Sequence, residues 1–587
     1  MAGLHLAGLA GADIVAPDGE PHAPGSPALA LAPAAGHAPA APERVRVRVA
    51  RRHPGARWAR LRAALARWVE VASEGIWGWV YRVSMVAIAA ALVWALWRIQ
   101  EVTGTGGTVV YTGAWWHKGL RWLELLWLAP APLAAALWAG WLVWAEAARR
   151  EPAPRPAPQV AVLVDGPAVA RMPARLVFRF VTRGEQVEAL QASLEAARAA
   201  MRAMPPAPGA PSRAGAVTAY RIEIVSDRSL PSLAAPDCAV YAIPADYQTV
   251  ARSRFKARAL TYLQGASPAT GDEWRLYLDE ESRVDPSVVA GIYDFIERAE
   301  REAAHGGPEA RRRIGQGAML YEGGPAFFRA ADALRTGDDL GRFRLQYGLG
   351  APVFGAHGSF LLVRGMDEPS LSFDVGARNS ITEDAAWALQ AWGCGWRFGW
   401  IAGYVREQPP QSVMDFVRQR ARWLTGVRLV ALDRAVPLGC RIILLLFVAL
   451  WQLSFVPLLV TLVALATHTP PIAWMRLPAD ITWATFMLAY LQGLDTQAAR
   501  AARKRAWPGP ARLRPLWLVW ARVREWTLAL GIFWYSLLEM FAVIYSLRRE
   551  VNFHVIRKPR VTEPIGARDN AARTPLSADE RRAGAHA

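Results

Sequence analysis

The sequence has few cysteines and fewer acidic than basic residues. Its three cysteines, Cys238, Cys394 and Cys440, are scattered, without the spacing of a metal cluster or a disulfide framework. Any catalytic metal ion must therefore be held by oxygen ligands. Asp and Glu number 50 against 68 Lys and Arg, which gives a formal net charge of +18. Such a charge can indicate nucleic acid as a partner, but the chain has no nucleic-acid-binding motif.

The arginines cluster instead beside apolar runs, which is typical of the cytoplasmic flanks of membrane helices and of contact with anionic lipid. Apolar residues make up 53% of the chain, with 27 Trp, several of which border the apolar runs. Two runs, Ile76 to Trp97 and Trp122 to Ala145, approach the roughly 20 residues that cross a bilayer. Arginines precede the first run and follow the second. This bias predicts that the segment beyond residue 150 is cytoplasmic.

The two ends of the chain are less structured in this interpretation. Residues 1–43 are rich in Ala and Pro without periodicity, so we expect them to be disordered, and they do not resemble a secretory signal. Residues 44–150 then hold an amphipathic helix, Ala56 to Val71, and the two spans. The helix is expected to lie on the membrane, with docking on the soluble domain as the alternative. Residues 548–587 are expected to be a basic cytoplasmic tail.

Residues 437–547 hold three further apolar blocks. Three single spans would place the basic tail outside the cell, against the charge rule. One block must therefore be interfacial or re-entrant, or the third must form a hairpin, and the sequence leaves this open. Glu539 lies deep in the last block, where we favour a contact with an Arg. The blocks are Leu438 to Ala466, Ile472 to Leu494 and Leu516 to Leu547.

Residues 160–436 alternate strand and helix patterns, which predicts an α/β domain with a mostly parallel sheet. The strand Leu176 to Val181 precedes the helix Gln186 to Met201, and the strand Arg221 to Val225 follows. Ligands of such sheets bind at the carboxyl ends of the strands. Asp227 comes at such an end and is expected to bind a nucleoside, with a simple turn Asp as the alternative.

Two further groups suit a phosphorylated ligand. Lys256 and Arg258 open a helix and are placed to meet phosphates, unless they form an ordinary solvated face. Asp279-Glu280-Glu281 directly follows the strand Arg275 to Leu278. Adjacent carboxylates repel unless a cation joins them, so we expect Asp279 and Glu281 to hold Mg²⁺ or Mn²⁺ on a diphosphate. Because side chains alternate along an extended segment, Glu280 should point elsewhere; an acidic turn is the alternative.

The stretch Thr382-Glu383-Asp384, followed by Gln419-Arg420-Ala421-Arg422-Trp423, carries the strongest signal. An Asp can take a proton, an Arg fork suits a leaving phosphate, and a Trp face suits a sugar ring. Alone, each motif is an ordinary helix pattern. In this order, before an apolar run, they resemble the paired signature of membrane-integrated family-two glycosyltransferases, which include cellulose, hyaluronan and mannan synthases.

Between residues 176 and 558 the order of local motifs also resembles the egghead-type β-1,4-mannosyltransferases. The resemblance implies a GT-A type fold, a nucleotide-sugar donor (GDP-mannose by analogy) and inverting transfer of a hexose to a lipid-linked or polysaccharide acceptor. Departures at Thr382 and within Gly355 to Ser359 leave the acceptor open. The matching motifs are Val181 to Gly184, Ile222 to Asp227, Phe255 to Leu260, Leu278 to Ser282, Ile314 to Gly317, Ser372 to Asp374, Ser380 to Asp384, Gln419 to Trp423 and Asn552 to Lys558.

The resemblance also assigns roles. Asp384 would be the general base, and Asp279 with Glu281 would hold the divalent ion. The nucleoside would be bound by Asp227 with the loop of Thr182 and Arg183, and Lys256 would help to bind the donor. The acceptor and the leaving diphosphate would be framed by Gln419, Arg422 and Trp423. A processive UDP-sugar polysaccharide synthase and a catalytically silent membrane scaffold are the alternatives. The intact carboxylates argue against the second.

Overall fold

The computed structural model describes residues 76–102, 125–143, 152–164, 168–206, 220–306, 312–453, 473–504 and 514–548, with a few single residues between these ranges. Three predictions lie outside the described residues. These are the disordered segment 1–43, the amphipathic helix Ala56 to Val71 and the basic tail from residue 549 onward. They remain predictions.

A seven-stranded mixed sheet forms the centre of the fold, in the order β5-β4-β3-β6-β8-β7-β9. Its β8 runs antiparallel to both neighbours, whereas the other described pairings are parallel. The predicted α/β domain is therefore present. The strands are β3 (Arg175–Thr182), β4 (Tyr220–Ser226), β5 (Cys238–Ala242), β6 (Glu273–Asp279), β7 (Arg313–Tyr321), β8 (Leu361–Arg364) and β9 (Arg397–Glu407), beside a separate antiparallel hairpin of β1 (Gln159–Val164) and β2 (Ala168–Pro173).

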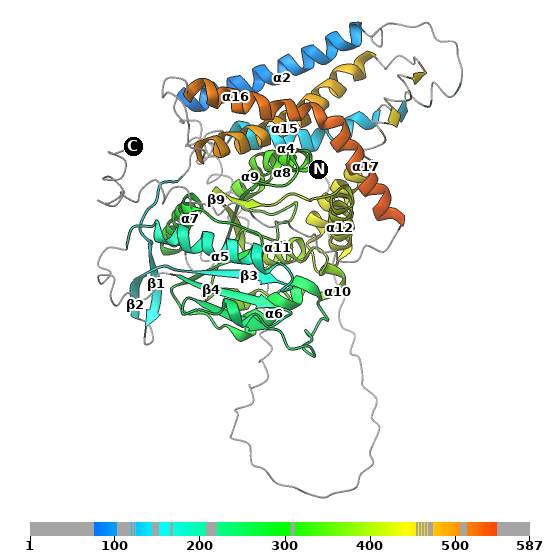
Figure 1. The fold of residues 1–587 in the computed structure, drawn as a ribbon. Helices are drawn as coiled ribbons and strands as arrows, with labels where there is room; N and C mark the ends of the chain where they lie inside the picture. The colour runs from blue at the N-terminus through cyan, green and yellow to red at the C-terminus, as the bar shows by residue number, and fades with distance from the viewer. Residues whose placement is uncertain are drawn as a thin grey trace, which may run out of the picture. The chain divides into compact units, whose positions relative to one another are not determined.

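Helices cover both faces of this sheet (Figure 1). On one face α5 (Val187–Arg202) and α7 (Pro286–Gly306) pack on Phe178 and its neighbours in a buried core. On the other face Tyr277 and Val363 share a second core with Trp387 of α11 (Glu383–Gly393) and residues of α6 (Phe255–Ala266). Because both faces of the strands β3, β4 and β6 are covered, even their charged residues Arg179, Glu223 and Arg275 are buried, and Arg179 pairs with Glu223 at 2.7 Å.

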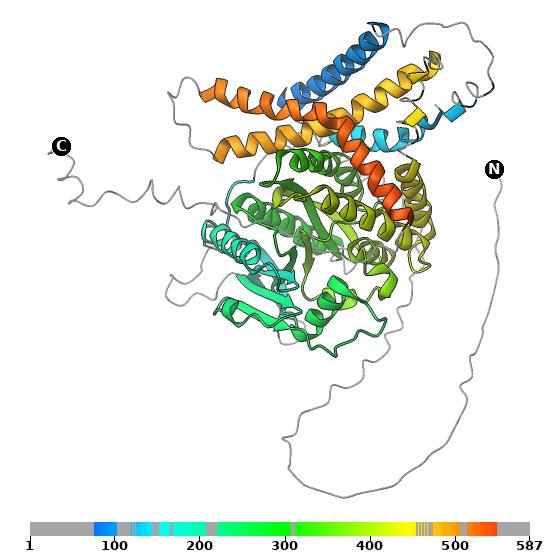
Figure 2. The same cartoon turned by 45° about the vertical axis from the view of Figure 1, so that its right-hand side comes forward.

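The remaining helices join the sheet domain to an apolar layer. Both Figure 1 and Figure 2 show α2, α4, α15 and α16 gathered on one side of the sheet domain, with α17 running down beside α12. The remaining helices are α2 (Ile76–Val102), η1 (Leu125–Leu128), α4 (Ala131–Val143), α8 (Ala326–Asp338), the π-helical η5 (Asp339–Phe343), α9 (Arg344–Gly348), α10 (Gly376–Asn379), α12 (Val413–Leu432), α13 (Leu438–Leu453), α15 (Ala473–Lys504), α16 (Arg514–Trp526), η8 (Thr527–Gly531) and α17 (Ile532–Arg548). Two short 3₁₀ helices, η3 (Pro231–Leu233) and η6 (Glu368–Ser370), lie in the sheet domain.

Helix α15 contains most of the apolar block Ile472 to Leu494, for which the sequence left open whether it spans the membrane. It packs on α8 so closely that a Cβ at Gly493 would lie 1.9 Å from the carbonyl oxygen of Ala333. Its buried residues include Arg476 and Asp480, and Asp480 accepts a hydrogen bond from the Gln100 side chain at 2.8 Å. Buried polar groups of this kind need protein partners, which lipid tails do not supply. In this structure α15 is a helix docked on the sheet domain through α8.

Two described helical segments are long and apolar enough to cross a membrane, by length and composition alone: Trp79–Val102, within α2, and Leu516–Leu547, which runs from α16 to α17. Two other predicted apolar segments, Trp122 to Ala145 and Leu438 to Ala466, lie only partly within the described residues. The described helix α4 in the first has 13 residues, with Leu137 and Trp141 buried, and α13 in the second has 16, each fewer than the roughly 20 residues required to cross a bilayer.

Candidate active site

A cavity of about 1200 Å³ opens at the carboxyl ends of β3, β4 and β6. It reaches from Asp227 at one side to the helices η1, α4, α13, α15 and α17 at the other. All the site residues predicted from the sequence line this single cavity: Thr182, Arg183, Asp227, Lys256, Arg258, Asp279, Glu281, Asp384, Gln419, Arg422 and Trp423. The fold therefore brings together motifs that lie up to 241 residues apart (182 to 423).

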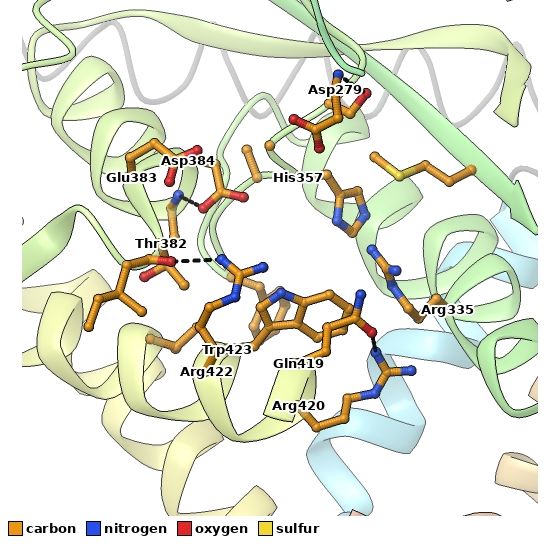
Figure 3. A pocket seen from close by; sticks show the side chains of 18 of the residues that line it. Asp279, Arg335, His357, Thr382, Glu383, Asp384, Gln419, Arg420, Arg422 and Trp423 are labelled. Atoms are coloured by element: carbon orange, nitrogen blue, oxygen red, sulfur yellow. Dashed lines mark hydrogen bonds between the residues drawn. The ribbon is translucent and has the colours of Figure 1, made fainter. Parts of the chain in front are cut away.

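The pair Glu383 and Asp384 begins helix α11, where two acidic side chains are favoured by the helix dipole. One carboxylate oxygen of Asp384 accepts a hydrogen bond from the Ala385 amide at 2.8 Å, and Glu383 is buried. The ring of Trp387, one turn later, stacks on Phe373 with centroids 4.8 Å apart and nearly parallel planes. This stacking fixes the helix, and hence the direction of the Asp384 carboxylate into the cavity (Figure 3).

Lys256 connects the two acidic motifs. Its Nζ donates to the Asp279 carboxylate and to the carbonyl oxygen of Gly358, and lies 3.9 Å from Glu383. Gly358 allows this approach, because a Cβ there would lie 3.1 Å from the Asp384 carboxylate and 3.2 Å from Nζ. Asp279 and Glu383 therefore lie beside a single ammonium group, and the Asp384 carboxylate lies next to Gly358, whose carbonyl oxygen accepts from the same group.

Burial and neighbouring charges shift the pKa values of Glu383, Asp384 and Lys256. Burial, with the Asp384 charge beside it, raises the pKa of Glu383 to about 7. Burial likewise raises the pKa of Asp384, against the lowering effect of Lys256. For Lys256, burial disfavours the ammonium form, but Asp279 and Glu383 outweigh it and raise the pKa. Asp384 is thus a better proton acceptor than an ordinary Asp, which suits general-base work near neutral pH.

The acidic turn after β6 differs from the prediction in one respect. Glu280 was expected to point away, yet Asp279, Glu280 and Glu281 all line the cavity. The chain turns here, with the Ser282 amide donating to the Asp279 carbonyl at 3.0 Å, so the alternation of an extended strand does not apply. Glu280 accepts a hydrogen bond from the Thr182 hydroxyl, which ties the turn to the end of β3.

The prediction of a divalent metal ion was tested against this geometry. Among the described residues no group of three or more His, Cys, Asp or Glu side chains could hold a metal ion. The side chain of Asp279 is 36% exposed and faces the cavity. One carboxylate, together with phosphate oxygens of a ligand and water, is a common Mg²⁺ environment. The residues therefore fit an ion that arrives with a diphosphate, and Asp279 and Glu281 remain predicted ligands.

At the far side of the cavity, two predicted residues pair with each other. Arg258 donates to the Asp227 carboxylate at 2.8 Å. The Thr182 hydroxyl accepts a hydrogen bond from the Gly184 amide at 2.9 Å, which shapes the loop that carries Arg183. A ligand that bound here would replace contacts within the Arg258–Asp227 ion pair. That Asp227, Thr182 and Arg183 bind a nucleoside stays a prediction.

Helix α12 carries the Gln-x-x-Arg-Trp motif and is docked on the start of α11. Arg422 donates to the carbonyl oxygen of Ile381 at 3.2 Å. A Cβ at Gly426 would lie 2.3 Å from a methyl carbon of Thr382, so the helix approaches this residue closely. Two guanidinium groups make cation–π contacts with the indole of Trp423: that of Arg335 lies 4.4 Å and that of Arg420 4.5 Å from its ring centroid. Any sugar that Trp423 contacts would share the indole with these cations.

Glu539 and His357 both line the cavity and are held by protein partners. Arg420 pairs with Asp332 of α8 and, at 2.8 Å, with Glu539 of α17, which confirms the favoured contact of Glu539 with an Arg. His357 lies 2.6 Å from Asp339 and stacks on Phe343 at 4.2 Å between centroids. It is a packed histidine on the cavity wall.

Sequence reasoning missed two features of the cavity. One is Arg335 of α8, which lines it beside Trp423. The other is its apolar end, to which Leu133, Trp451 and Phe486 belong. Neither carries a sequence motif, because Arg335 belongs to an ordinary amphipathic helix and the apolar residues come from the three separate helices α4, α13 and α15.

Residues 274–547 match the family model described as "Glycosyl transferase family group 2". The chain is 30% identical over 238 residues to the β-1,4-mannosyltransferase egh of Drosophila melanogaster and 29% identical to bre-3 of Caenorhabditis elegans. These alignments cover 40% of this chain and 50% of each relative. The chain thus spans about half the length of the curated relatives it matches. The resemblance to family-two glycosyltransferases is confirmed.

Among solved structures, the fold is similar to the crystal structure of Staphylococcus aureus TarS 1–349 in complex with UDP, at 11% identity and a TM-score of 0.28. That match covers 65% of this chain and 94% of TarS 1–349. A likeness at this level carries no argument about ligands.

Proposed function

We propose that this relative of the family-two glycosyltransferases is an inverting β-mannosyltransferase, which moves mannose from GDP-mannose to a lipid-linked or polysaccharide acceptor at a membrane. One observation carries the proposal. Asp384, Asp279 and the Gln-x-x-Arg-Trp helix, which are far apart in sequence, line a single cavity at the carboxyl ends of the strands. The identity to two β-1,4-mannosyltransferases supports the choice of sugar.

In this mechanism Asp384 accepts the proton of the acceptor hydroxyl. The hydroxyl oxygen forms a bond to the anomeric carbon on the face opposite the diphosphate, and the bond to the diphosphate oxygen breaks. The electron pair leaves with the nucleoside diphosphate, beside Arg422. The raised pKa of Asp384 supports its role as the base. Asp279 and Glu281 would hold a divalent ion, which when bound neutralises charge on the diphosphate.

The shape of the cavity favours a lipid-linked acceptor over a free polysaccharide. Its charged end contains Asp384 and Lys256, and its apolar end is lined by Leu133, Trp451 and Phe486 from separate helices. An amphiphile with a sugar head and an apolar tail matches this division. The two long apolar helical segments and the arginines of their flanks support a membrane location with a cytoplasmic catalytic domain.

The test measures release of nucleoside diphosphate by the full chain in lipid nanodiscs, with GDP-mannose, UDP-glucose and UDP-N-acetylglucosamine as donors. We expect release from GDP-mannose in the presence of a lipid-linked acceptor. Asp384→Asn should lower the rate by ~10²–10⁴-fold while the fold is retained, the usual size of general-base catalysis. Asp272→Asn, a matched change just before β6, should leave it unchanged. Near-normal transfer by Asp384→Asn would refute the assignment.

The product of the same assay separates the alternatives. A long polymer made from a UDP-sugar would replace this proposal with a processive polysaccharide synthase. A chain that releases no nucleotide from any donor, with every acceptor supplied, would be a membrane scaffold. A single added mannose would support the transferase.

A further inference from the structure

Arg335 differs from the other buried or half-buried cationic residues that line the cavity; Arg252 and Arg254, which also line it, are exposed. Most of them have a hydrogen-bond acceptor of their own: Lys256 has Asp279, Arg258 has Asp227, Arg342 has Asp338, Arg420 has Asp332, and Arg422 has the carbonyl of Ile381. Within the described part of the chain, Arg335 makes neither a hydrogen bond nor an ion pair. Asp332, one turn earlier on α8, accepts from Arg420 with one carboxylate oxygen and acts on Arg335 through its charge, without a hydrogen bond between the two.

The guanidinium of Arg335 is held by aromatic faces instead. It lies 4.9 Å from the ring centroid of Tyr321 and 4.4 Å from that of Trp423. Stacking of this kind fixes the plane of a guanidinium and leaves its N–H donors free along the edge. In Figure 3 the group lies between the ring of His357 and the indole of Trp423, on the wall that faces Asp384 and Asp279.

A charge in this position calls for an anionic ligand. Arg cannot lose its proton, and although the charges of Asp332 and Glu407 favour the cation, neither carboxylate accepts a hydrogen bond from Arg335 in the described chain. An oxyanion in the cavity would accept its hydrogen bonds, and the planar fork suits phosphate better than a neutral hydroxyl. Arg335 also lies at the boundary between the charged and the apolar ends of the cavity, because its neighbour Leu334 belongs to the apolar lining with Phe486.

We propose that Arg335 is a further phosphate-binding residue of this site and that it binds an oxyanion placed beside Trp423. This rests on the proposed transfer from a nucleotide sugar. The phosphate comes either from the leaving diphosphate or from a lipid acceptor that carries phosphate. In the second case the acceptor is an anionic amphiphile, whose head lies at Arg335 and whose tail follows the apolar wall.

The test measures binding by calorimetry, with the full chain in phosphatidylcholine nanodiscs and Mg²⁺ present. The probes are inorganic pyrophosphate, farnesyl phosphate and uncharged farnesol. Arg335→Gln should weaken at least one phosphate probe by about tenfold or more, the size of a charge-assisted hydrogen bond, and leave farnesol unchanged. Arg335→Lys, which keeps the charge without the fork, should show a smaller loss. Arg202→Gln, an exposed change at the end of α5, should show none.

The outcomes divide as follows. Loss of pyrophosphate affinity alone assigns Arg335 to the leaving diphosphate, and loss of farnesyl phosphate affinity alone assigns it to the acceptor. Affinities of Arg335→Gln equal to those of the unmodified chain for both phosphates would overturn the proposal, as would equal weakening of farnesol. If Arg335→Gln does not fold, Arg335→Lys with unchanged affinities would overturn it. A failure of the transferase proposal appears separately, as absence of nucleotide release by the unmodified chain.

Discussion

The close contact between Gly426 and Thr382 makes a quantitative prediction about the position of α12. A Cβ added at Gly426 would lie 2.3 Å from a methyl carbon of Thr382 and 2.9 Å from its Cβ. Carbon atoms that are not bonded prefer separations of about 3.5–4.0 Å. In Gly426→Ala, α12 must therefore move by roughly 1.2 Å, or by roughly 0.6 Å if the Thr382 side chain rotates away. The shift carries Arg422 and Trp423 with it.

A displacement of this size matters because Asp384 stays on α11 while Arg422 moves. Misplacement of catalytic groups by about 1 Å can cost on the order of 10²-fold in rate. We expect kcat to fall by roughly 10- to 100-fold on that basis. The free energy of unfolding should fall by about 1–3 kcal/mol, the usual cost of an overpacked contact. If the chain remains folded after this loss of stability, the fall in kcat is larger than the small unfolded fraction would produce.

The measurement pairs nucleotide release with thermal unfolding in the same nanodiscs. Gly265→Ala is the matched control, because a Cβ there meets no atom within 4 Å, and it should keep full activity. Adding Thr382→Ala to Gly426→Ala removes the methyl and hydroxyl groups that clash, and should recover part of the rate. If Gly426→Ala lost stability but kept its kcat, the idea that α12 must sit against α11 for chemistry would be wrong.

Further predictions concern the charges around Asp384 and the docking of α15. Because the Asp384 charge adds to burial in raising the pKa of Glu383 to about 7, Asp384→Asn should lower the pKa of Glu383 in an infrared titration of its carboxyl group; an unmoved pKa would contradict the coupling. Lys256→Met should move the acidic limb of kcat/KM to higher pH, since the ammonium lowers the pKa of Asp384. Asp279→Ala should abolish metal-dependent donor binding in calorimetry, and unchanged affinity would count against its metal role. Gly493→Ala should lower the free energy of unfolding by about 1–3 kcal/mol, because its Cβ would meet α8 at 1.9 Å; an unchanged melting temperature would show that the contact is not tight.

Local patterns predicted the catalytic domain well. The strand pattern Leu176 to Val181 lies within β3, and the predicted helix from Gln186 to Met201 corresponds to α5. Asp227 and Asp279 follow parallel strands of one sheet, and the carboxyl ends of such strands meet at one edge. This geometry explains why residues chosen by motif line a single cavity, although their chemical roles remain predictions.

Features that depend on packing between distant segments were not predicted. Hydropathy could not show that α15 lies on α8, because a docked helix and a lipid-facing helix share their apolar composition. The inward position of Glu280 follows from a turn that the strand pattern did not reveal. Arg335 packs against the rings of Tyr321 and Trp423, and no carboxylate in the described chain accepts a hydrogen bond from it. Only the assembled structure shows these contacts.

The buried pairing of Arg420 with Asp332 and Glu539 has an evolutionary consequence. These three residues come from α12, α8 and α17, and the side chains of Arg420 and Asp332 are almost completely buried. A buried charge that loses its partner costs several kcal/mol, so a relative that replaces one of the three should replace the others as well. Across homologous chains, positions 332, 420 and 539 should therefore covary, and a lineage that lost the arginine should carry neutral residues at both acidic positions.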